Sequence, residues 1–227
     1  MDKYFKLLDQ YCQYDYSHCA NRNHKSRAYT FKYVWDEMIK LKCPTIIELG
    51  TTRSFLHGGV SEGCMVADKK YWHPEHPENL DWSAGNFTFV FGQLPNKELH
   101  TVDINPNHIW ISKTMTEEFT GMYYHISDSV EFLKKFKGHT DLIYLDSGDV
   151  GEETAKLHER EANVIVDREI VKVGGYVLMD DVRSNVAVTQ FGEKSRFGKD
   201  KYSIGYFLAN GYDWVMDEYQ LIMRRMG

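Results

Sequence analysis

Three aspartates follow two apolar segments, at points where strands of a sheet would end. Asp146 closes DLIYLD (141–146), and the pair Asp180 and Asp181 closes GYVLMDD (175–181). If these strands are neighbours, their carboxyl ends bring three carboxylates together, and like charges raise one another's pKa. A hard divalent cation, Mg²⁺ above all, would compensate this charge through oxygen ligands. The alternative is that the aspartates are separate, and either solvated or capping helices.

A second candidate site lies at the turn after TIIEL (45–49). Glu48 stands near the end of this segment, and Gly50 lets a ligand approach the backbone because it has no Cβ. Open α/β sheets bind ligands beyond the carboxyl ends of their strands, so a nucleotide-like cofactor is expected here. The alternative is a plain tight β–α turn. A dinucleotide site in particular is disfavoured, because the G-x-G-x-x-G pattern is missing.

Polar residues also end the next two expected strands. Asp103 ends LHTVD, where a carboxylate can accept two hydrogen bonds from a ribose diol or can simply be solvated. Ser127, Asp128 and Ser129 follow the third strand and open a helix. They suit a helix N-cap, a position beside a bound adenine, or both.

The elements that must position these residues alternate between strands and helices. Short apolar runs separated by helical periodicity predict a Rossmann-like, doubly wound α/β fold with a mostly parallel sheet covered on both faces. The last two strands are separated by only about two residues, which is too short for a crossover helix and therefore predicts an antiparallel terminal hairpin. The seven expected strands are TIIEL, ELHTVDI, MYYHIS, DLIYLD, GYVLMDD, YDWVMD and YQLIMRR.

The chain of 227 residues is expected to form a single domain. Residues 1–43 form an N-terminal helical cap with helices at 3–13 and 26–42, and residues 44–227 form the core. An insertion at about 56–97, rich in Gly, Pro, His and Trp, interrupts the core and is expected to contain a helix or strand at 86–92. Within it, YWHPEHPENLDW (71–82) suggests a substrate lid whose tryptophans either stack on a ring or anchor an irregular loop.

Composition restricts the partners. The net charge of −6, with acidic and basic residues interspersed, argues against a nucleic-acid binder. The sequence has no apolar leader and no run long enough to span a membrane, and its four cysteines are scattered. We therefore expect a soluble cytoplasmic protein with a small-molecule substrate. Aromatic residues on the N-terminal helices make a homodimer plausible.

The ordered segments TIIELGTTRSF, LHTVDINP, ISDSVEFLKKF, DLIYLDSGDV and VGGYVLMDDV resemble class I S-adenosylmethionine-dependent methyltransferases. More narrowly, they resemble the metal-dependent small-molecule O-methyltransferases of the catechol and macrocin type, over about residues 44–225. The resemblance implies that S-adenosylmethionine is the cofactor and Mg²⁺ or another divalent cation a second one. The implied cofactor-binding residues are Glu48, Gly50, Thr51 and Ser54 of the first loop, Asp103 at the ribose, Ser127, Asp128 and Ser129 by the adenine, and Asp146. The implied metal ligands are Asp146, Asp180 and Asp181.

The general base is not fixed by this resemblance. Catechol-type enzymes have a lysine three residues beyond the first metal aspartate, where this chain has Asp149. Asp149, His158 on the following helix, and Asp146 itself are the candidates. The expected function is a metal-assisted O-methyltransferase acting on a sugar, a nucleotide-linked intermediate or another hydroxylated metabolite, as in antibiotic or surface-glycan tailoring. The alternatives are a non-catalytic S-adenosylmethionine-binding protein and an NAD-dependent oxidoreductase.

Overall fold

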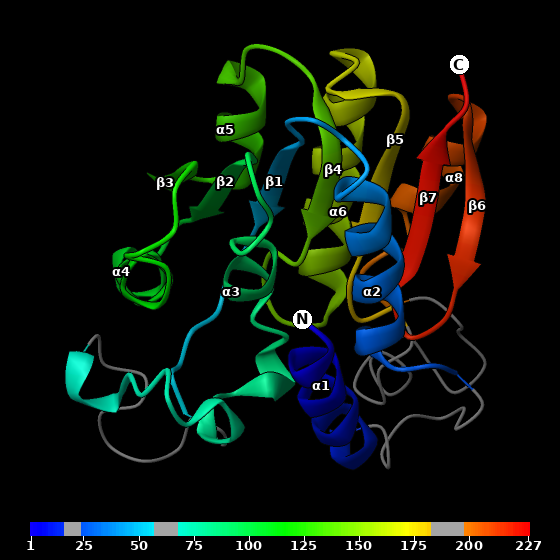
Figure 1. Cartoon of the computed structure of the whole chain (residues 1–227). Helices are drawn as coiled ribbons and strands as arrows, with labels where there is room; N and C mark the ends of the chain where they lie inside the picture. Colours follow the sequence, from blue (N-terminus) through cyan, green and yellow to red (C-terminus); the bar gives the residue numbers. More distant parts are fainter. Residues whose placement is uncertain (16–23, 57–67, 183–197) are drawn as a thin grey trace.

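The computed structural model describes residues 1–15, 24–56, 68–182 and 198–227, and its centre is a seven-stranded sheet (Figure 1). The strand order is β3-β2-β1-β4-β5-β7-β6. The first five strands are parallel, and β7 runs antiparallel between β5 and β6. The Rossmann-like fold and its terminal hairpin are therefore confirmed. The strands are β1 Thr45–Leu49, β2 Glu98–Asp103, β3 Met122–Ile126, β4 Thr140–Leu145, β5 Val171–Met179, β6 Tyr212–Asp217 and β7 Leu221–Arg225.

Helices cover both faces of this sheet (Figure 1). Alternate residues of β4 show the two layers, because Leu142 and Tyr144 pack into one buried cluster and Ile143 and Leu145 into the other. Strands buried on both faces read as continuous apolar runs, which is why their sequences are recognisable. On the first face lie α1 Asp2–Asp15, α2 Arg27–Met38, α3 Phe87–Phe91 and α4 Pro106–Met115, and on the second lie α5 Ser129–Lys135, α6 Glu152–Asp167 and α8 Ser203–Ala209.

One expected helix is shorter than its periodicity suggests. The helix expected at 26–42 ends at Met38, and five residues of irregular backbone, 39–43, precede Pro44. The α4 helix begins at Pro106 because Asn105 caps it, with the Asn105 side chain accepting a hydrogen bond from the Asn107 N–H at 2.9 Å. Because β2 ends at Asp103 and α4 begins at Pro106, only two residues connect this strand to the helix.

In the described part of the expected insertion, residues 80–97 belong largely to the core, whereas none of residues 68–79 is buried. All five residues of α3 are buried, so the element expected at 86–92 is a helix. Trp82 is 0 % exposed, donates its indole N–H to the Pro77 carbonyl at 2.6 Å, and packs against Tyr4 of α1. This tryptophan therefore anchors an irregular segment rather than stacking on a ligand. The lid expected at 71–82 contains two short 3₁₀ turns, η2 Lys69–Tyr71 and η3 Pro77–Asn79, before η4 Trp82–Ala84, and residues 57–67 of the insertion lie outside the described part.

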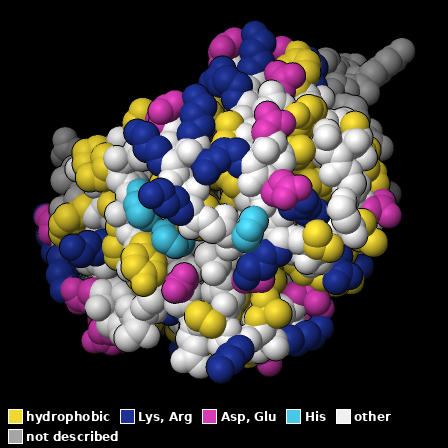
Figure 2. Space-filling view, turned by 90° about the horizontal axis from the view of Figure 1, so that it is seen from above, with side chains coloured by type: hydrophobic (Ala, Val, Ile, Leu, Met, Phe, Trp, Pro, Cys, Tyr) yellow, Lys and Arg dark blue, Asp and Glu magenta, His cyan; other side chains and the backbone are white. Residues whose placement is uncertain are grey.

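The end of the molecule at the amino ends of the parallel strands is drawn in Figure 2. Basic side chains are frequent there, with acidic ones among them. Ion pairs at this end include Lys172 with Asp141 at 2.8 Å and Arg225 with Glu169 at 3.0 Å. Within the described ranges, no helix is long and apolar enough to cross a membrane.

Candidate active site

A cavity of about 550 Å³ lies at the opposite end, beyond the carboxyl ends of β1, β2, β4 and β5. This is the position at which open α/β sheets bind their ligands. The residues around it come from segments far apart in the sequence, and the turn after β1, Asp103 and the acid cluster share the space. Its lining comprises Arg27, Gly50, Thr51, Thr52, Arg53, Ala84, Asp103, Ile104, Asn105, His108, Asp146, Gly148, Asp149, Asp180, Asp181, Lys199 and Tyr219.

The turn after β1 requires glycine for two reasons. Gly50 has φ +79°, in the left-handed region, and a Cβ built there would lie 2.5 Å from the Asp146 carbonyl oxygen. A side chain at this position would therefore separate the turn from the end of β4. Because of this close approach, the turn after β1, where the cofactor is expected, contacts Asp146 at the end of β4.

Asp103 is held facing the cavity by its neighbours. Its carboxylate accepts hydrogen bonds from the Thr51 N–H at 3.1 Å and from the Asn105 N–H at 2.7 Å. His108 Nδ1 lies 3.2 Å from Asp103 Oδ2. These contacts fix an acceptor group at the end of β2, where a ribose diol would donate to it.

Glu48 does not line the cavity. It is 1 % exposed and turns toward α3, where its carboxylate accepts hydrogen bonds from the Thr88 hydroxyl and from the Thr88 N–H at 3.2 Å. Burial raises the pKa of Glu48 to about 7. The Thr88 hydroxyl lies 3.0 Å from that of Thr51, so Glu48 is connected to the cofactor turn through one threonine.

Four other residues implied at the cofactor, Ser54, Ser127, Asp128 and Ser129, do not line this cavity. Ser54 is buried and donates to Asp81 Oδ2 at 2.6 Å. Asp128 caps α5 by accepting a hydrogen bond from the Glu131 N–H at 3.0 Å, which confirms the N-cap interpretation. Ser127 lines a different cavity, between α5 and β3, and Ser129 is buried in the first turn of α5. Their contact with an adenine stays a prediction.

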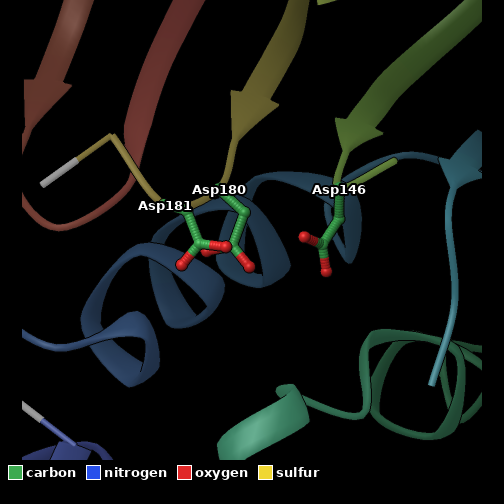
Figure 3. Close-up of side chains that lie close together, drawn as sticks. All are labelled: Asp146, Asp180 and Asp181. Carbon is green, nitrogen blue, oxygen red and sulfur yellow. The ribbon is translucent and has the colours of Figure 1, made fainter. Parts of the chain in front are cut away.

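The three aspartates expected to meet do so, because β4 and β5 are neighbours (Figure 3). One carboxylate oxygen from each of Asp146, Asp180 and Asp181 can be chosen so that all lie within 4.8 Å of one another. Asp181 has φ +53°, which is unfavourable for a residue with a side chain and costs on the order of 1–3 kcal/mol. The strand therefore ends in a strained residue that turns its carboxylate back toward the cluster.

Two cations that the sequence analysis missed lie among these acids. Lys199 Nζ is 2.7 Å from Asp146 Oδ1 and 3.0 Å from Asp181 Oδ2, and its side chain is 2 % exposed. Arg27 binds Asp180 through two nitrogens, with Nη2 2.7 Å from Oδ2 and Nε 3.2 Å from Oδ1. The charge of the cluster is thus compensated largely by the chain itself. The signal that predicts such partners is physical, because buried carboxylates require cations, but no spacing identifies which cations they are.

Neutral donors complete the cluster. The Tyr144 hydroxyl donates to Asp180 Oδ2 at 2.9 Å, and the Gln220 amide donates to Asp180 Oδ1 at 2.8 Å. The Tyr219 hydroxyl donates to Asp181 Oδ1, and the Thr30 hydroxyl donates to the Gln220 side-chain oxygen. Helix α2, strand β4 and the β6–β7 turn are joined through these groups.

The surroundings separate the pKa values of the aspartates. Burial raises the pKa of Asp146 well above its usual range, even though Lys199 opposes that effect. Burial also acts to raise the pKa of Asp180, but the charges of Arg27 and Lys199 outweigh it and hold that pKa well below its usual range. The neighbouring carboxylates raise the pKa of Lys199, so it stays an ammonium.

The structure separates the three candidates for the general base. Asp146 lines the cavity, and Asp149 lies at its rim with a side chain 81 % exposed and 2.7 Å from Arg53 Nη1. His158 is 0 % exposed on α6, lies outside the cavity lining, and has Nε2 3.2 Å from the Ser147 carbonyl oxygen. Burial lowers the pKa of His158 to about 3. The choice of His158 as base is therefore not supported, because a buried neutral imidazole cannot reach a substrate in the cavity.

Comparison with solved structures places the fold among methyltransferases. No protein-family model and no curated protein sequence matches the chain. The N-methyltransferase NodS of Bradyrhizobium japonicum, in complex with S-adenosylhomocysteine, superposes with a TM-score of 0.53 at 12% identity, covering 96% of this chain and 98% of NodS. S-adenosylhomocysteine-bound methyltransferase PaMTH1 of Podospora anserina gives 0.53 at 14% identity, covering 97% and 88%. A candidate O-methyltransferase from Klebsiella pneumoniae gives 0.53 at 10% identity, covering 97% and 90%.

The fold is that of these enzymes. At such low identity the similarity is one of fold alone, and it does not select the acceptor atom.

Proposed function

We propose that this protein is an S-adenosylmethionine-dependent methyltransferase that methylates a hydroxyl oxygen of a polar small molecule. The observation that carries this proposal is that Asp103 and the acid cluster open into one cavity. Asp103 would hold the ribose, and the backbone of Gly50 and Thr51 would face the methionine part. The carboxylates at the ends of β4 and β5 would then lie at the reacting end of the cofactor.

The chain's own groups suit a hydroxyl acceptor. Bound S-adenosylmethionine supplies a methyl carbon whose bond to the sulfonium breaks as the acceptor oxygen bonds to it. Asp146 lines the cavity, and a carboxylate whose pKa burial raises is a stronger base than an exposed one. It would accept the hydroxyl proton. The protein's main task is then to hold the acceptor oxygen in line with the methyl carbon.

The polar lining indicates the substrate class. Besides the acids, the cavity presents Arg53, Asn105 and the Tyr219 hydroxyl. Donors and acceptors of both kinds suit a molecule with several hydroxyl groups, such as a sugar, a nucleotide-linked sugar or another hydroxylated metabolite. An apolar aromatic acceptor would place apolar surface against these polar side chains.

The divalent ion expected from the sequence does not fit the cluster as it is arranged. Both oxygens of Asp180 accept two hydrogen bonds each, from Arg27, Tyr144 and Gln220. Asp146 and Asp181 share the Lys199 ammonium.

The proposal is tested by binding and turnover together. Calorimetry should detect S-adenosylhomocysteine binding to the wild-type chain, and Asp103→Asn should weaken it by about 10- to 100-fold, the effect of losing charge-assisted hydrogen bonds. Asp36→Asn is the matched control, because Asp36 is exposed on α2, outside the cavity lining, and pairs with Lys32 at the surface. Incubation with S-adenosylmethionine and a panel of sugars and nucleotide sugars should release S-adenosylhomocysteine. Binding without release for any acceptor would instead identify a non-catalytic cofactor-binding protein.

A further inference from the structure

The acid cluster contains a cation of its own at the point where the three acids meet. Three carboxylates lie close together, and the ammonium of Lys199 contacts two of them at 2.7 and 3.0 Å. A divalent ion bound by the same acids would have to lie within about 2.0–2.6 Å of their oxygens. An ammonium at hydrogen-bond distance from Asp146 and Asp181 therefore occupies the space in which such an ion would bind.

The third acid is also engaged. Asp180 is 1 % exposed, and its carboxylate has four donors at 2.7–3.2 Å. A carboxylate offers about four lone-pair positions, so this one is saturated. Recruiting Asp180 to a metal would break its two-nitrogen ion pair with Arg27, whose side chain is 7 % exposed, and leave this buried guanidinium with Asp181, 3.9 Å away, as its nearest other carboxylate partner among the described ion pairs.

Lys199 is positioned by a folded turn and not by an exposed, freely rotating segment. The Gly198 N–H donates to Asp200 Oδ1 at 3.0 Å, and the Asp200 carbonyl accepts the Ile204 N–H of α8 at 3.1 Å. Lys201, two residues further on, points away from the cluster and pairs with Glu152 of α6 at 3.0 Å. The two lysines of one turn thus have different surroundings.

An ammonium has three N–H donors; Lys199 donates one hydrogen bond to Asp146 Oδ1 at 2.7 Å and forms an ion pair with Asp181 Oδ2 at 3.0 Å. Among the described residues no third acceptor is bonded to Lys199, which lines the cavity. The third donor is therefore available to an oxygen atom of a ligand in that cavity.

On these grounds, and resting on the function proposed above, we propose that Lys199 takes the place of the divalent ion. Its ammonium binds the acceptor oxygen and stabilises the negative charge that develops there, so that methyl transfer needs no metal. The proton of the hydroxyl passes to Asp146, the oxygen–carbon bond forms, and the electron pair of the carbon–sulfur bond stays on the sulfur of S-adenosylhomocysteine. No redox partner or further reactant is required.

The first experiment measures metal binding directly and does not depend on turnover. Calorimetric titration of the chelator-treated wild-type chain with Mg²⁺ and Mn²⁺ should show no stoichiometric binding. Lys199→Ala removes the ammonium and vacates the space, so this variant should gain a one-to-one divalent site that the further substitution Asp146→Asn abolishes. Stoichiometric binding to the wild type, lost in Asp146→Asn, would overturn the proposal even if no acceptor were ever found.

The second experiment uses turnover. Release of S-adenosylhomocysteine by the wild type should be unchanged by EDTA, whereas Lys199→Met should reduce it by about 10²- to 10³-fold, the effect of removing one donor from a developing oxyanion. The affinity for S-adenosylhomocysteine should stay within experimental error. Lys201→Met is the matched control in the same turn and should keep wild-type turnover. Activity that disappears in EDTA and returns with Mg²⁺ would refute the inference.

Lys199→Met leaves buried acids without a cation, so its folding must be checked by thermal unfolding. If Lys199→Met does not fold, the double variant Lys199→Met/Asp181→Asn is used in its place, because it removes one positive and one negative charge together. This variant should fold and stay inactive. Near-wild-type turnover in a folded variant without Lys199 would contradict the proposal.

Discussion

Arg27 and Asp180 stand 153 residues apart in the sequence and form a two-nitrogen, two-oxygen ion pair with its closest contact at 2.7 Å. Both side chains are buried, at 7 % and 1 % exposure. The pair connects helix α2 to the end of β5 and neutralises the acid that follows this strand. Loss of this ion pair should lower the stability of the whole fold as well as change the cavity.

Arg27→Met should therefore lower the free energy of unfolding by about 3–5 kcal/mol, the cost of leaving a buried charge without its partner. Urea unfolding followed by circular dichroism measures this loss. Lys32→Met, which breaks an exposed pair with Asp36 on the same helix, should cost less than about 1 kcal/mol. Adding Asp180→Asn to Arg27→Met should restore part of the stability. Equal losses of stability in Arg27→Met and Lys32→Met would show that the buried ion pair contributes no more to stability than the exposed one.

Gly50→Ala should destroy cofactor binding. The substitution forces a side chain into the left-handed region and toward the Asp146 carbonyl oxygen, 2.5 Å from the new Cβ. The backbone strain alone is about 1–3 kcal/mol, and the turn must move away from β4. Calorimetry with S-adenosylhomocysteine is the measurement. Gly205→Ala is the control, because a Cβ at this position of α8 meets nothing within 4 Å, and unimpaired binding by Gly50→Ala would show that the turn does not contact the cofactor.

Glu48→Gln should change how stability depends on pH. Burial raises the pKa of Glu48 from 4.5 to about 7, so between these values the folded protein holds a proton that the unfolded chain has released. The wild type therefore loses stability as pH rises through this window, by up to about 3 kcal/mol. The amide cannot ionise, so the variant should gain on the wild type from pH 5 to 7 and keep a constant advantage above. Urea unfolding at several pH values checks this, and a difference that does not vary with pH would contradict it.

His158→Gln should retain methyl transfer. His158 is fully buried and outside the cavity lining, so its replacement should reduce turnover by less than about tenfold, whereas losing a general base costs about 10²–10⁴-fold. Asp146→Asn should show the larger loss. The comparison requires rates of S-adenosylhomocysteine release from both variants, and the reverse order would restore the histidine as base.

The sequence predicts the sheet well because each central strand is apolar on both faces and each ends in a polar residue. That regularity also predicts the meeting of Asp146 with Asp180 and Asp181, which needs only that β4 and β5 be neighbours. The alternation within β1 bears on Glu48 as well. Side chains of a strand alternate between its two faces, so Glu48 lies on the same face as Ile46. It therefore points toward α2 and α3 and not into the cavity beyond the end of the strand.

The cations of the cluster were not predictable in the same way. Lys199 and Arg27 reach the acids from a turn before α8 and from the start of α2, and their approach depends on tertiary packing. Local periodicity carries no information about such contacts. The inference that buried acids need compensating positive charge is consistent with the two cations that lie among them, Lys199 and Arg27.

The tight turn between β6 and β7 supplies Tyr219 to Asp181 and Gln220 to both Asp180 and Thr30. During biosynthesis, α2, β4 and β5 leave the ribosome well before this hairpin does. Until residue 220 has emerged, the aspartates at the end of β5 lack two of their donors, and β5 has an open edge where β7 will pair. The nascent chain must therefore postpone closure of its reactive centre, and a ribosome that stalls just upstream of the hairpin would leave an intermediate with buried acids unsatisfied and a strand edge open to aggregation.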